Sequence, residues 1–482
     1  MTATQAQPQP ALGLAHLFID GAGCDGAGPE RILIDPASAQ PWHGTRDASE
    51  DQLRLAVSGA KAALPVWAGR APAARAKVLM RLAALIEERA GQLAAIEARN
   101  VGKPLAQARR DVIRAADYFR FYAGACDKLN GETIPLGGER TALTLLEPVG
   151  VTAHILPWNY PLSTLARGVA PALAAGASVV AKPSELTPLS AVTLAQWALE
   201  AGLPAGLFNV ICGGGEIGAA LAGHPDIAHV TFTGSTESGR KVMQSAAVPV
   251  AGVTLELGGK SPVIVLADAD LEAAAKDVAH GIFFNAGQIC TAGARLICQR
   301  SVHDALVARI AALGEAMQMG DPLEDPDLGP LVSANQRNRV EGFVERAKAA
   351  GLTCITGGQR PDRAGYFYPP TIFTAVPPAA EIAQCEVFGP VLVTQCCDGP
   401  DEALALANGT AFGLVAGIYS ADATQALRLA RRLEAGQVFV NGFLKGGDSI
   451  PFGGVKHSGI GREKGLAGLA AYALPKAIIL SH

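Results

Sequence analysis

The chain contains 482 residues, a length that predicts two to three domains at about 150 residues per domain. Hydrophobic residues make up 49% of the chain and charged residues 17%, which excludes a disordered or collagen-like protein. The formal net charge is −4, so the chain has no overall basic field with which to capture nucleic acid.

The N-terminal residues and the cysteines bear on the compartment. Residues 1–13 lack Lys and Arg and are rich in Ala, Gln and Pro, so we expect a flexible tail and not a secretory signal. The longest uncharged stretch, residues 148–166, is interrupted by Pro157 and Pro161 and is not expected to span a membrane. Nine cysteines without a CxxC pair and nine histidines without an HExxH motif indicate neither a disulfide framework nor a metal site. We therefore expect a cytoplasmic protein with no metal, no membrane association and no nucleic-acid partner.

Amphipathic helices are expected first, because apolar residues recur every three or four positions between residues 74 and 129. Residues 129–147 hold a Gly-rich turn between two strand-like segments, a pattern that predicts a projecting hairpin. Short apolar runs then alternate with helical stretches. Strands are predicted at residues 151–156, 178–181, 208–211, 229–231 and 253–257, and helices at residues 162–175, 190–201, 216–222 and 237–246.

A second series of similar texture follows, with strands near residues 262–266, 296–298, 391–395 and 415–419, and helices near residues 271–284, 303–314, 334–350 and 422–433. Together the two series predict an α/β protein with a doubly wound parallel sheet and a second α/β domain. The apolar residues 477–480 predict a C-terminal strand. That strand either joins a partner's sheet or packs on its own domain.

Two Gly-containing segments compete for a phosphate-binding role. Residues 213–218 match GxGxxG between a predicted strand and a helix, but no acidic residue ends a strand about 20 residues later. Gly234 and Ser235 end another strand at a helix start, where backbone N–H groups and the helix dipole would face an anion. Each segment also has an ordinary structural interpretation, as a Gly-rich helix start and as a Ser N-cap.

Three residues could carry out chemistry. Cys290 stands at a turn of small residues, where backbone N–H groups would favour its thiolate, although a lone Cys is often buried packing. Glu256 ends a strand before two glycines, a place from which a general base can swing toward a substrate, although it could be a surface acid. Asn159 lies between two prolines and could present its amide to an oxyanion, or could simply belong to a rigid turn.

A series of short motifs stands in a fixed order between residues 157 and 454. The motifs are Pro157-Trp158-Asn159-Tyr160-Pro161, Lys182-Pro183-Ser184-Glu185, Phe232-Thr233-Gly234-Ser235, Glu256-Leu257-Gly258-Gly259-Lys260, Gly287-Gln288-Ile289-Cys290, Glu386-Val387-Phe388-Gly389-Pro390 and Pro451-Phe452-Gly453-Gly454. This ordered set resembles the aldehyde dehydrogenase superfamily, from about residue 15 to the C-terminus.

The resemblance implies a Rossmann-like cofactor domain, a catalytic α/β domain and a small β oligomerisation element. It assigns residues 1–128 and 148–255 to the NAD-binding domain and residues 256–455 to the catalytic domain. Residues 129–147 and 456–482 would form the oligomerisation element and the C-terminal segment of a homodimer or homotetramer.

The resemblance also implies an NAD-dependent oxidation of an aldehyde to a carboxylic acid. Cys290 would be the nucleophile that forms a thiohemiacetal and then a thioester, and the Asn159 side chain with the Cys290 backbone N–H would hold the oxyanion. Glu256 would activate the hydrolytic water. The cofactor-binding residues implied in the same way are Trp158, Lys182, Glu185, Gly234, Ser235, Leu257, Glu386 and Phe388.

Tyr160, Arg167 and Thr291 would face the substrate, which we expect to be a bulky aldehyde that is aromatic or carries an acidic or hydroxyl group. Arg167 lies a little over two helical turns after Asn159 and could stack on a ring or pair with a carboxylate, or form a structural ion pair at the subunit surface. Lys445 adds weak support for an anionic substrate.

One departure from the family concerns Arg167-Gly168, because many relatives carry Trp-Lys there, so a proton relay through that Lys is not assumed. Two other functions are alternatives to this one. A CoA-acylating semialdehyde dehydrogenase usually lacks the carboxylate found at Glu256, and a crystallin-like structural protein predicts a damaged catalytic set.

Overall fold

The strands predicted between residues 151 and 257 form the centre of an eight-stranded sheet in the computed structural model, which describes residues 16–482. The order is β2-β1-β9-β8-β7-β10-β11-β21, and the five central strands run parallel. This is the doubly wound arrangement that the alternation of strands and helices predicts. Its strands are β1 Leu17–Ile19, β2 Ala22–Cys24, β7 Val151–Ile155, β8 Ser178–Lys182, β9 Phe208–Val210, β10 Ile227–Thr233, β11 Gly252–Glu256 and β21 Gly459–Ile460.

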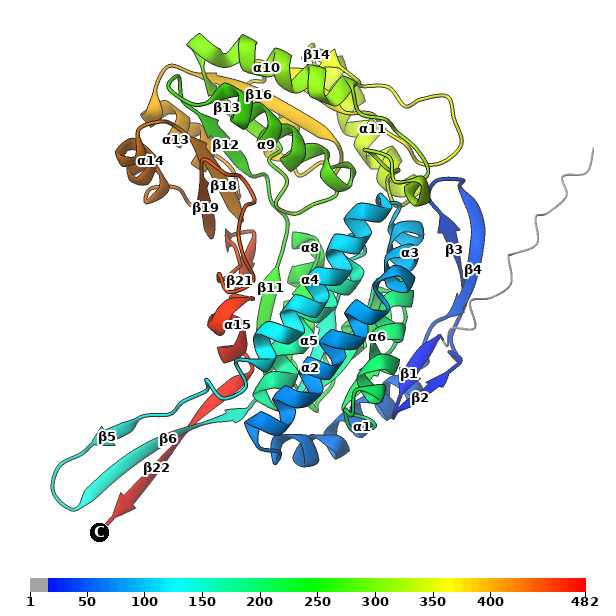
Figure 1. The fold of residues 1–482 in the computed structure, drawn as a ribbon, viewed down its shortest axis with the longest axis vertical. Coiled ribbons are helices and arrows are strands. Elements are labelled where there is room, and N and C mark those ends of the chain that lie inside the picture. Colours follow the sequence, from blue (N-terminus) through cyan, green and yellow to red (C-terminus); the bar gives the residue numbers. More distant parts are fainter. Residues whose placement is uncertain (1–15) are drawn as a thin grey trace, which may run out of the picture.

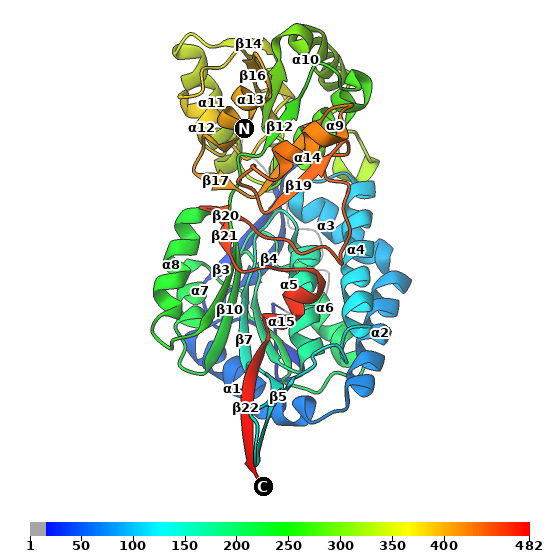
Figure 2. The same cartoon turned by 90° about the vertical axis from the view of Figure 1, so that its left-hand side faces the viewer.

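Helices cover both faces of this sheet (Figure 1, Figure 2). One face packs against α1, α7 and α8, and the other against α5 and α6, with α2, α3 and α4 forming an outer layer. The bounds are α1 Glu50–Ala68, α2 Pro72–Glu88, α3 Ala90–Val101, α4 Leu105–Ala123, α5 Pro161–Ala175, α6 Leu189–Glu200, α7 Gly215–Ala222 and α8 Thr236–Ala246. Every residue of α5 except Arg167 is buried, which agrees with a helix placed between the sheet and the outer helices.

The second predicted series forms a seven-stranded sheet of order β14-β15-β16-β13-β12-β18-β19, parallel except at β14. Its strands are β12 Pro262–Val265, β13 Arg295–Gln299, β14 Thr353–Thr356, β15 Thr371–Thr374, β16 Val391–Cys397, β18 Val415–Tyr419 and β19 Gln437–Val440. The accompanying helices are α9 Leu271–Phe283, α10 Arg300–Glu315, α11 Ala334–Ala349, α12 Glu381–Gln384, α13 Pro400–Asn408 and α14 Ala423–Ala430.

The predicted hairpin projects from the body of the molecule as an arm (Figure 1). Strands β5 Thr133–Pro135 and β6 Arg140–Pro148 pair with each other, and β22 Ala473–Ser481 pairs with β6 along its whole length. The C-terminal strand therefore pairs with its own chain, and the addition of its free edge to a partner's sheet stays a prediction. The order β22-β6-β5 leaves β22 at an edge.

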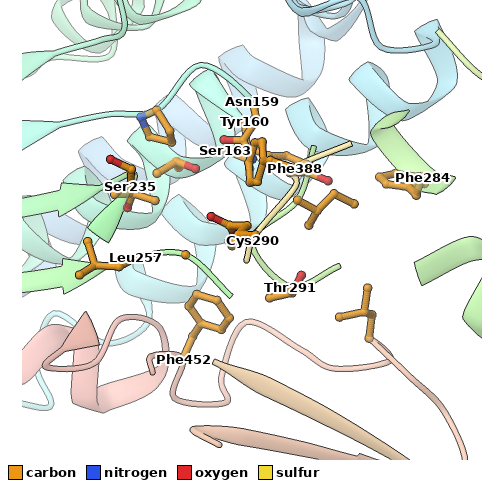
Figure 3. A pocket seen from close by; sticks show the side chains of 18 of the residues that line it. Asn159, Tyr160, Ser163, Ser235, Leu257, Phe284, Cys290, Thr291, Phe388 and Phe452 are labelled. Carbon is orange, nitrogen blue, oxygen red and sulfur yellow. The ribbon is translucent and has the colours of Figure 1, made fainter. Parts of the chain in front are cut away.

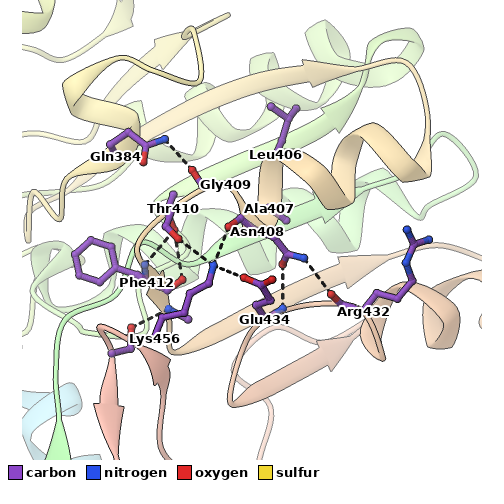
Figure 4. A network of polar contacts seen from close by, with 12 residues as sticks. Gln384, Leu406, Ala407, Asn408, Gly409, Thr410, Phe412, Arg432, Glu434 and Lys456 are labelled. Carbon is purple, nitrogen blue, oxygen red and sulfur yellow. Dashed lines mark hydrogen bonds and ion pairs between the residues drawn. The ribbon is translucent and has the colours of Figure 1, made fainter.

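The last segment of the chain returns from the second sheet to the first. Strand β20 (Val455–Lys456) pairs with β17 (Phe412–Gly413), and β21 then pairs with β11 opposite Glu256. Lys456 Nζ donates to the carbonyls of Asn408 and Thr410 at 2.8 and 2.9 Å, within the polar network of Figure 4. These contacts fix the segment that follows α13 beside the returning chain.

Some elements lie outside the predictions. These are α1, β1 and β2, the hairpin of β3 Glu30–Asp35 and β4 Gln40–Arg46, α15 Gly465–Ala470, and the additional strands and short helices of the second sheet. The predicted N-terminal tail lies outside the described residues. No helix among residues 16–482 is both long and apolar enough to cross a membrane.

Candidate active site

A cavity of about 930 Å³ lies at the carboxyl ends of the central strands of the first sheet, facing the second sheet. Its walls come from the loops after β7, β10 and β11, from the Cys290 loop and from the segment before β16. Most of the residues predicted for the site line it, namely Trp158, Asn159, Tyr160, Arg167, Gly234, Ser235, Leu257, Cys290, Thr291, Glu386 and Phe388. The cavity therefore unites residues that are more than 200 positions apart in the sequence.

The Cys290 loop begins with an unusual backbone. Asn285, Ala286 and Gly287 have φ of 50°, 52° and 70°, so consecutive residues adopt the left-handed conformation directly after α9. For Ala286 this conformation carries strain that only the surrounding packing maintains. The turn carries Cys290 into the cavity, where it is half-buried between Asn159 and Phe452 (Figure 3). Burial raises the pKa of the Cys290 thiol to about 12, and the nearby Arg167 guanidinium opposes that rise.

The Asn159 side chain is buried and held by the Cys290 loop. Its Nδ2 donates to the carbonyl of Gln288 at 2.8 Å. A primary amide has two N–H groups, so this bond leaves the second one for another acceptor. Because Gln288 lies two residues before Cys290, the same bond fixes the amide relative to the nucleophile.

Glu256 lies behind the cavity wall and not on it. The side chain is only 1% exposed, and neither carboxylate oxygen has a hydrogen-bond partner among residues 16–482. A Cβ at Gly453 would lie 2.8 Å from Glu256 Oε1, so the glycine makes room for the carboxyl group. Burial raises the pKa of Glu256 well above its ordinary value; the neighbouring Glu463 adds to the shift and Arg167 opposes it.

Arg167 lines the cavity and also forms a buried ion pair with Glu463. Its Nη2 donates to Thr233 Oγ1 at 3.2 Å, and its guanidinium carbon lies 5.2 Å from the centre of the Phe452 ring. The structure therefore contains an ion pair of Arg167, buried within the chain, and the contact of Arg167 with a substrate stays a prediction. Lys445 differs from the expectation, since it pairs with Asp277 at 2.9 Å and does not line the cavity.

The residues matched to cofactor binding differ in their surroundings. Trp158 and Phe388 make an edge-to-face contact with ring centres 5.3 Å apart on the cavity wall. Glu386 Oε1 accepts from the Gly259 backbone at 2.9 Å, and burial raises its pKa to about 7. Ser235 caps α8 by accepting from the Ser238 backbone at 3.2 Å, so its hydroxyl is the N-cap that the sequence allowed.

Lys182 and Glu185 lie outside this cavity. Lys182 is buried and its Nζ donates to the carbonyls of Pro183 and Gly213 at 3.0 and 2.8 Å, 4.0 Å from Glu185 Oε2. Glu185 lines a separate cavity of about 380 Å³. The GxGxxG segment opens α7 beside Lys182, whereas only the Gly234 and Ser235 segment reaches the large cavity.

Four buried polar residues at the cavity, of which Asp111 lines it, are not among the residues predicted from the sequence. Lys103, Asp111, Asn285 and Gln288 are all buried next to the Asn159 turn. Asn285 and Gln288 belong to the run around Cys290, so their proximity to the nucleophile was visible in the sequence. Nothing in the periodicity of residues 74–129 indicates that Lys103 lies near Asn159.

Residues 16–482 contain no group of three or more His, Cys, Asp and Glu side chains that could hold a metal ion.

The chain matches the aldehyde dehydrogenase family over residues 25–478. It is 42% identical to a betaine aldehyde dehydrogenase of Sinorhizobium fredii, with 98% of each chain covered. The chain belongs to the aldehyde dehydrogenase family. This finding confirms the resemblance, the predicted fold class and the prediction of an aldehyde-oxidising enzyme.

Solved structures agree at the level of the whole fold. A Burkholderia cenocepacia protein called a putative aldehyde dehydrogenase is 46% identical and superposes with a TM-score of 0.95, covering 97% of this chain and 100% of that one. A betaine aldehyde dehydrogenase of Staphylococcus aureus in complex with NAD⁺ is 35% identical and also superposes with a TM-score of 0.95, covering 98% and 97% of the two chains.

Proposed function

We propose that this aldehyde dehydrogenase oxidises an aldehyde to a carboxylic acid with NAD as hydride acceptor. The observation that carries the proposal is the bond from Asn159 Nδ2 to the Gln288 carbonyl, which sets an amide donor beside the Cys290 loop in the large cavity. A nucleophile, an oxyanion donor pair and a buried carboxylate are the groups that this reaction requires.

In the proposed reaction, the Cys290 thiol gives up its proton to solvent, and the resulting thiolate attacks the aldehyde carbon, whose carbonyl oxygen becomes an oxyanion. The free N–H of the Asn159 amide and the Cys290 backbone N–H hold that oxyanion. The adduct loses a hydride to the nicotinamide and becomes a thioester. Glu256, once ionised and turned into the cavity, takes a proton from water, which attacks the thioester and releases the acid and the thiol.

NAD fits the residues around the cavity. The N-terminus of α8 faces it through Gly234 and Ser235, which suits a pyrophosphate, and Glu386 and Phe388 would bind the nicotinamide ribose. Lys182 and Glu185 would bind the adenosine ribose, where the Glu185 carboxylate disfavours the 2′-phosphate of NADP. Relatives support this choice, since the S. aureus enzyme holds NAD⁺ and a 40% identical Sinorhizobium meliloti enzyme is called NAD-dependent.

The substrate we propose is a bulky aldehyde that is aromatic or carries an acidic or hydroxyl group. Aromatic residues line the cavity, namely Tyr160, Phe284, Phe439 and Phe452, and so do the cations Arg110, Arg114, Arg167 and Lys464, which outnumber the nearby acids Asp111 and Asp448. Betaine aldehyde, the substrate named for several relatives, carries a quaternary ammonium group, which these cations would repel. Thr291 would contact the aldehyde beside Cys290.

The proposed organisation follows the family. Residues 1–128 and 148–255 would bind NAD, residues 256–455 would supply catalysis, and the arm with the C-terminal segment would join subunits into a homodimer or homotetramer. We also propose the cytoplasm as the compartment, because all nine cysteines are free thiols, as in a reducing environment.

An absorbance screen for NADH over aliphatic, amino, acidic and aromatic aldehydes tests this function, with betaine aldehyde included. We expect NADH formation to be fastest with aromatic or carboxylate-bearing aldehydes and to need no CoA. Formation of an acyl-CoA only when CoA is added would instead support a CoA-acylating enzyme. Absence of NADH with every aldehyde would contradict the proposal.

A further inference from the structure

Lys103 lies in the short break between α3 and α4 and reaches the Asn159 turn from beneath. Its side chain is 1% exposed, which is rare for a lysine and requires good partners. Nζ donates to Asp111 Oδ2 at 2.6 Å and to the backbone carbonyl of Asn159 at 2.8 Å. It also lies 4.1 Å from the centre of the Tyr160 ring. The ammonium group thus contacts two consecutive residues of the turn.

Asn285 reaches the same carbonyl from the opposite element. Its Nδ2 lies 3.3 Å from the Asn159 carbonyl oxygen and 3.3 Å from that of Gln288. The Gln288 carbonyl in turn accepts from the Asn159 side chain. The Asn159 turn and the Cys290 loop are therefore joined by two hydrogen bonds, and a third, from Asn285 to Gln288, lies within the loop and shares the Gln288 carbonyl oxygen. We call Lys103 and Asn285 the carbonyl clamp.

We propose that the carbonyl clamp positions the oxyanion donors. Lys103 and Asn285 hold the backbone of Asn159 in place. The free side-chain N–H of Asn159 and the backbone N–H of Cys290 then point at the same substrate oxygen. The inference rests on the proposed aldehyde oxidation. Oxyanion donors act through preorganised geometry, and a shift of about 1 Å is enough to lose much of their effect. The clamp residues touch neither substrate nor thiol, so they are positioning residues.

The left-handed conformation of Asn285 allows its side chain to be removed without straining the backbone. Asn285→Gly removes the side-chain amide, while glycine adopts the φ of 50° without strain. For Lys103, the double variant Lys103→Met/Asp111→Asn removes the donor without leaving the Asp111 carboxylate buried and unpaired. Asn209→Ala is the matched control, because Asn209 is also a fully buried amide that holds backbone groups, at Ala56 and Asp20, away from the cavity lining.

Two rates are measured for each variant: kcat/KM for the best aldehyde, and the rate at which iodoacetamide alkylates Cys290. Alkylation of a thiol forms no oxyanion, so a defect in the donor pair changes only the first rate. Loss of one oxyanion donor costs about 10²–10³ in rate. We expect misplacement of the donor to lower kcat/KM roughly 10- to 100-fold, with alkylation and the KM for NAD within about threefold of wild type.

The control should lose thermal stability while its kcat/KM stays within about threefold of wild type. Wild-type kcat/KM in Asn285→Gly would overturn the inference, and so would a parallel fall of both rates, which indicates a collapsed Cys290 loop. If the double variant does not fold, Asn285→Gly decides alone. If the wild-type enzyme forms no NADH, the proposed function itself is contradicted. If the variants behave like the wild-type enzyme, only the positioning role of the carbonyl clamp is contradicted.

Discussion

At the scale of single residues, Cys290 has a thiol that its surroundings keep protonated. Burial raises its pKa to about 12, and of the charged neighbours only Arg167 lowers it, while Glu386 and Glu256 raise it further. A thiol is protonated below its pKa, so the free enzyme holds little thiolate at neutral pH. The nucleophile is therefore shielded from adventitious reaction.

This environment makes the first prediction. Alkylation of Cys290 by iodoacetamide without cofactor should accelerate with pH and reach no plateau below about pH 10, because the thiolate fraction keeps growing up to the raised pKa. Cys290→Ala should show no alkylation at this peptide and no NADH formation, while folding normally. A plateau near pH 7 would contradict the raised pKa.

Arg167 gives a second prediction, on specificity. The variant combines Arg167→Leu with Glu463→Gln, so that no buried carboxylate is left unpaired. The measured quantity is kcat/KM for aromatic or carboxylate-bearing aldehydes divided by kcat/KM for short aliphatic aldehydes. We expect this ratio to fall by at least about tenfold, or roughly 1.4 kcal/mol. Glu463→Gln alone is the control that keeps the guanidinium. A ratio that changes by less than about threefold would show that Arg167 serves structure alone.

Many residues of the candidate site could be predicted from the sequence. The residues that could not be predicted depend on contacts between distant parts of the chain. Cys290, Asn159 and Gly234 stand in local motifs whose turn residues reveal them, and each lines the cavity. The Lys103 contact with Asn159 spans 56 positions and leaves no local signal, because it depends on how α4 packs under the turn. The burial of Glu256 also depends on a distant glycine, Gly453.

At the scale of elements, helix α5 packs closely against the His154 side chain at Gly168. A Cβ at residue 168 would lie 2.7 Å from His154 Nδ1. The imidazole is fully buried, bound to Thr152 Oγ1 at 2.9 Å and stacked on Tyr472, so it cannot easily move away. A side chain at residue 168 therefore has no room unless α5 or the imidazole shifts.

The third prediction follows from this fit. Gly168→Ala should lower the free energy of unfolding by about 1–3 kcal/mol, because overpacking a tight core forces strain. Gly91→Ala is the control, since a Cβ there meets nothing within 4 Å inside helix α3 and should be neutral or stabilising. Denaturant unfolding measures both. Equal stability of the two variants would show that α5 can shift to make room.

The arm exposes an apolar edge. On β22, Leu474, Ile479 and Leu480 are 57%, 64% and 44% exposed. Large apolar side chains and an unpaired strand edge invite association with another chain. The proposed partner is a second copy of this protein.

The fourth prediction concerns this edge. Ile479→Asp combined with Leu480→Asp should shift the protein to a smaller species, because two charges would have to be desolvated at the subunit contact. Light scattering coupled to size-exclusion chromatography measures the mass. An unchanged oligomeric mass would exclude the β22 edge as the contact, and a wild-type monomer would contradict the proposed assembly.

The strands and helices that alternate regularly were predicted well, and those that depend on distant partners were not. Strands β7 and β8 are buried at every residue and β10 at all but two, as expected for a parallel sheet covered on both faces. Strand β14, with alternating exposed residues, is an antiparallel edge strand and gives a weaker signal. Short strands such as β21 exist only because β11 offers an edge.

At the scale of the whole molecule, two α/β units face each other across the cavity, and the chain crosses between them after β11 and again before β21 (Figure 1). Glu256 lies at both crossings, since it ends β11 and pairs in register with Gly459 of β21. The reaction we propose therefore depends on contacts between the two units. The thioester would form on Cys290 of the second unit and would be hydrolysed with the help of Glu256, which ends β11 of the first.

Peptide mass spectrometry of Glu256→Gln, quenched after mixing with NAD and the best aldehyde of the screen, tests the central claim most directly. Without the base, hydride transfer should proceed but hydrolysis should stall, so the account predicts an acyl group on the Cys290 peptide and at most about one NADH per subunit. NADH formation that continues at the wild-type rate with no acyl group on Cys290, or an acyl group on another cysteine, would contradict the account.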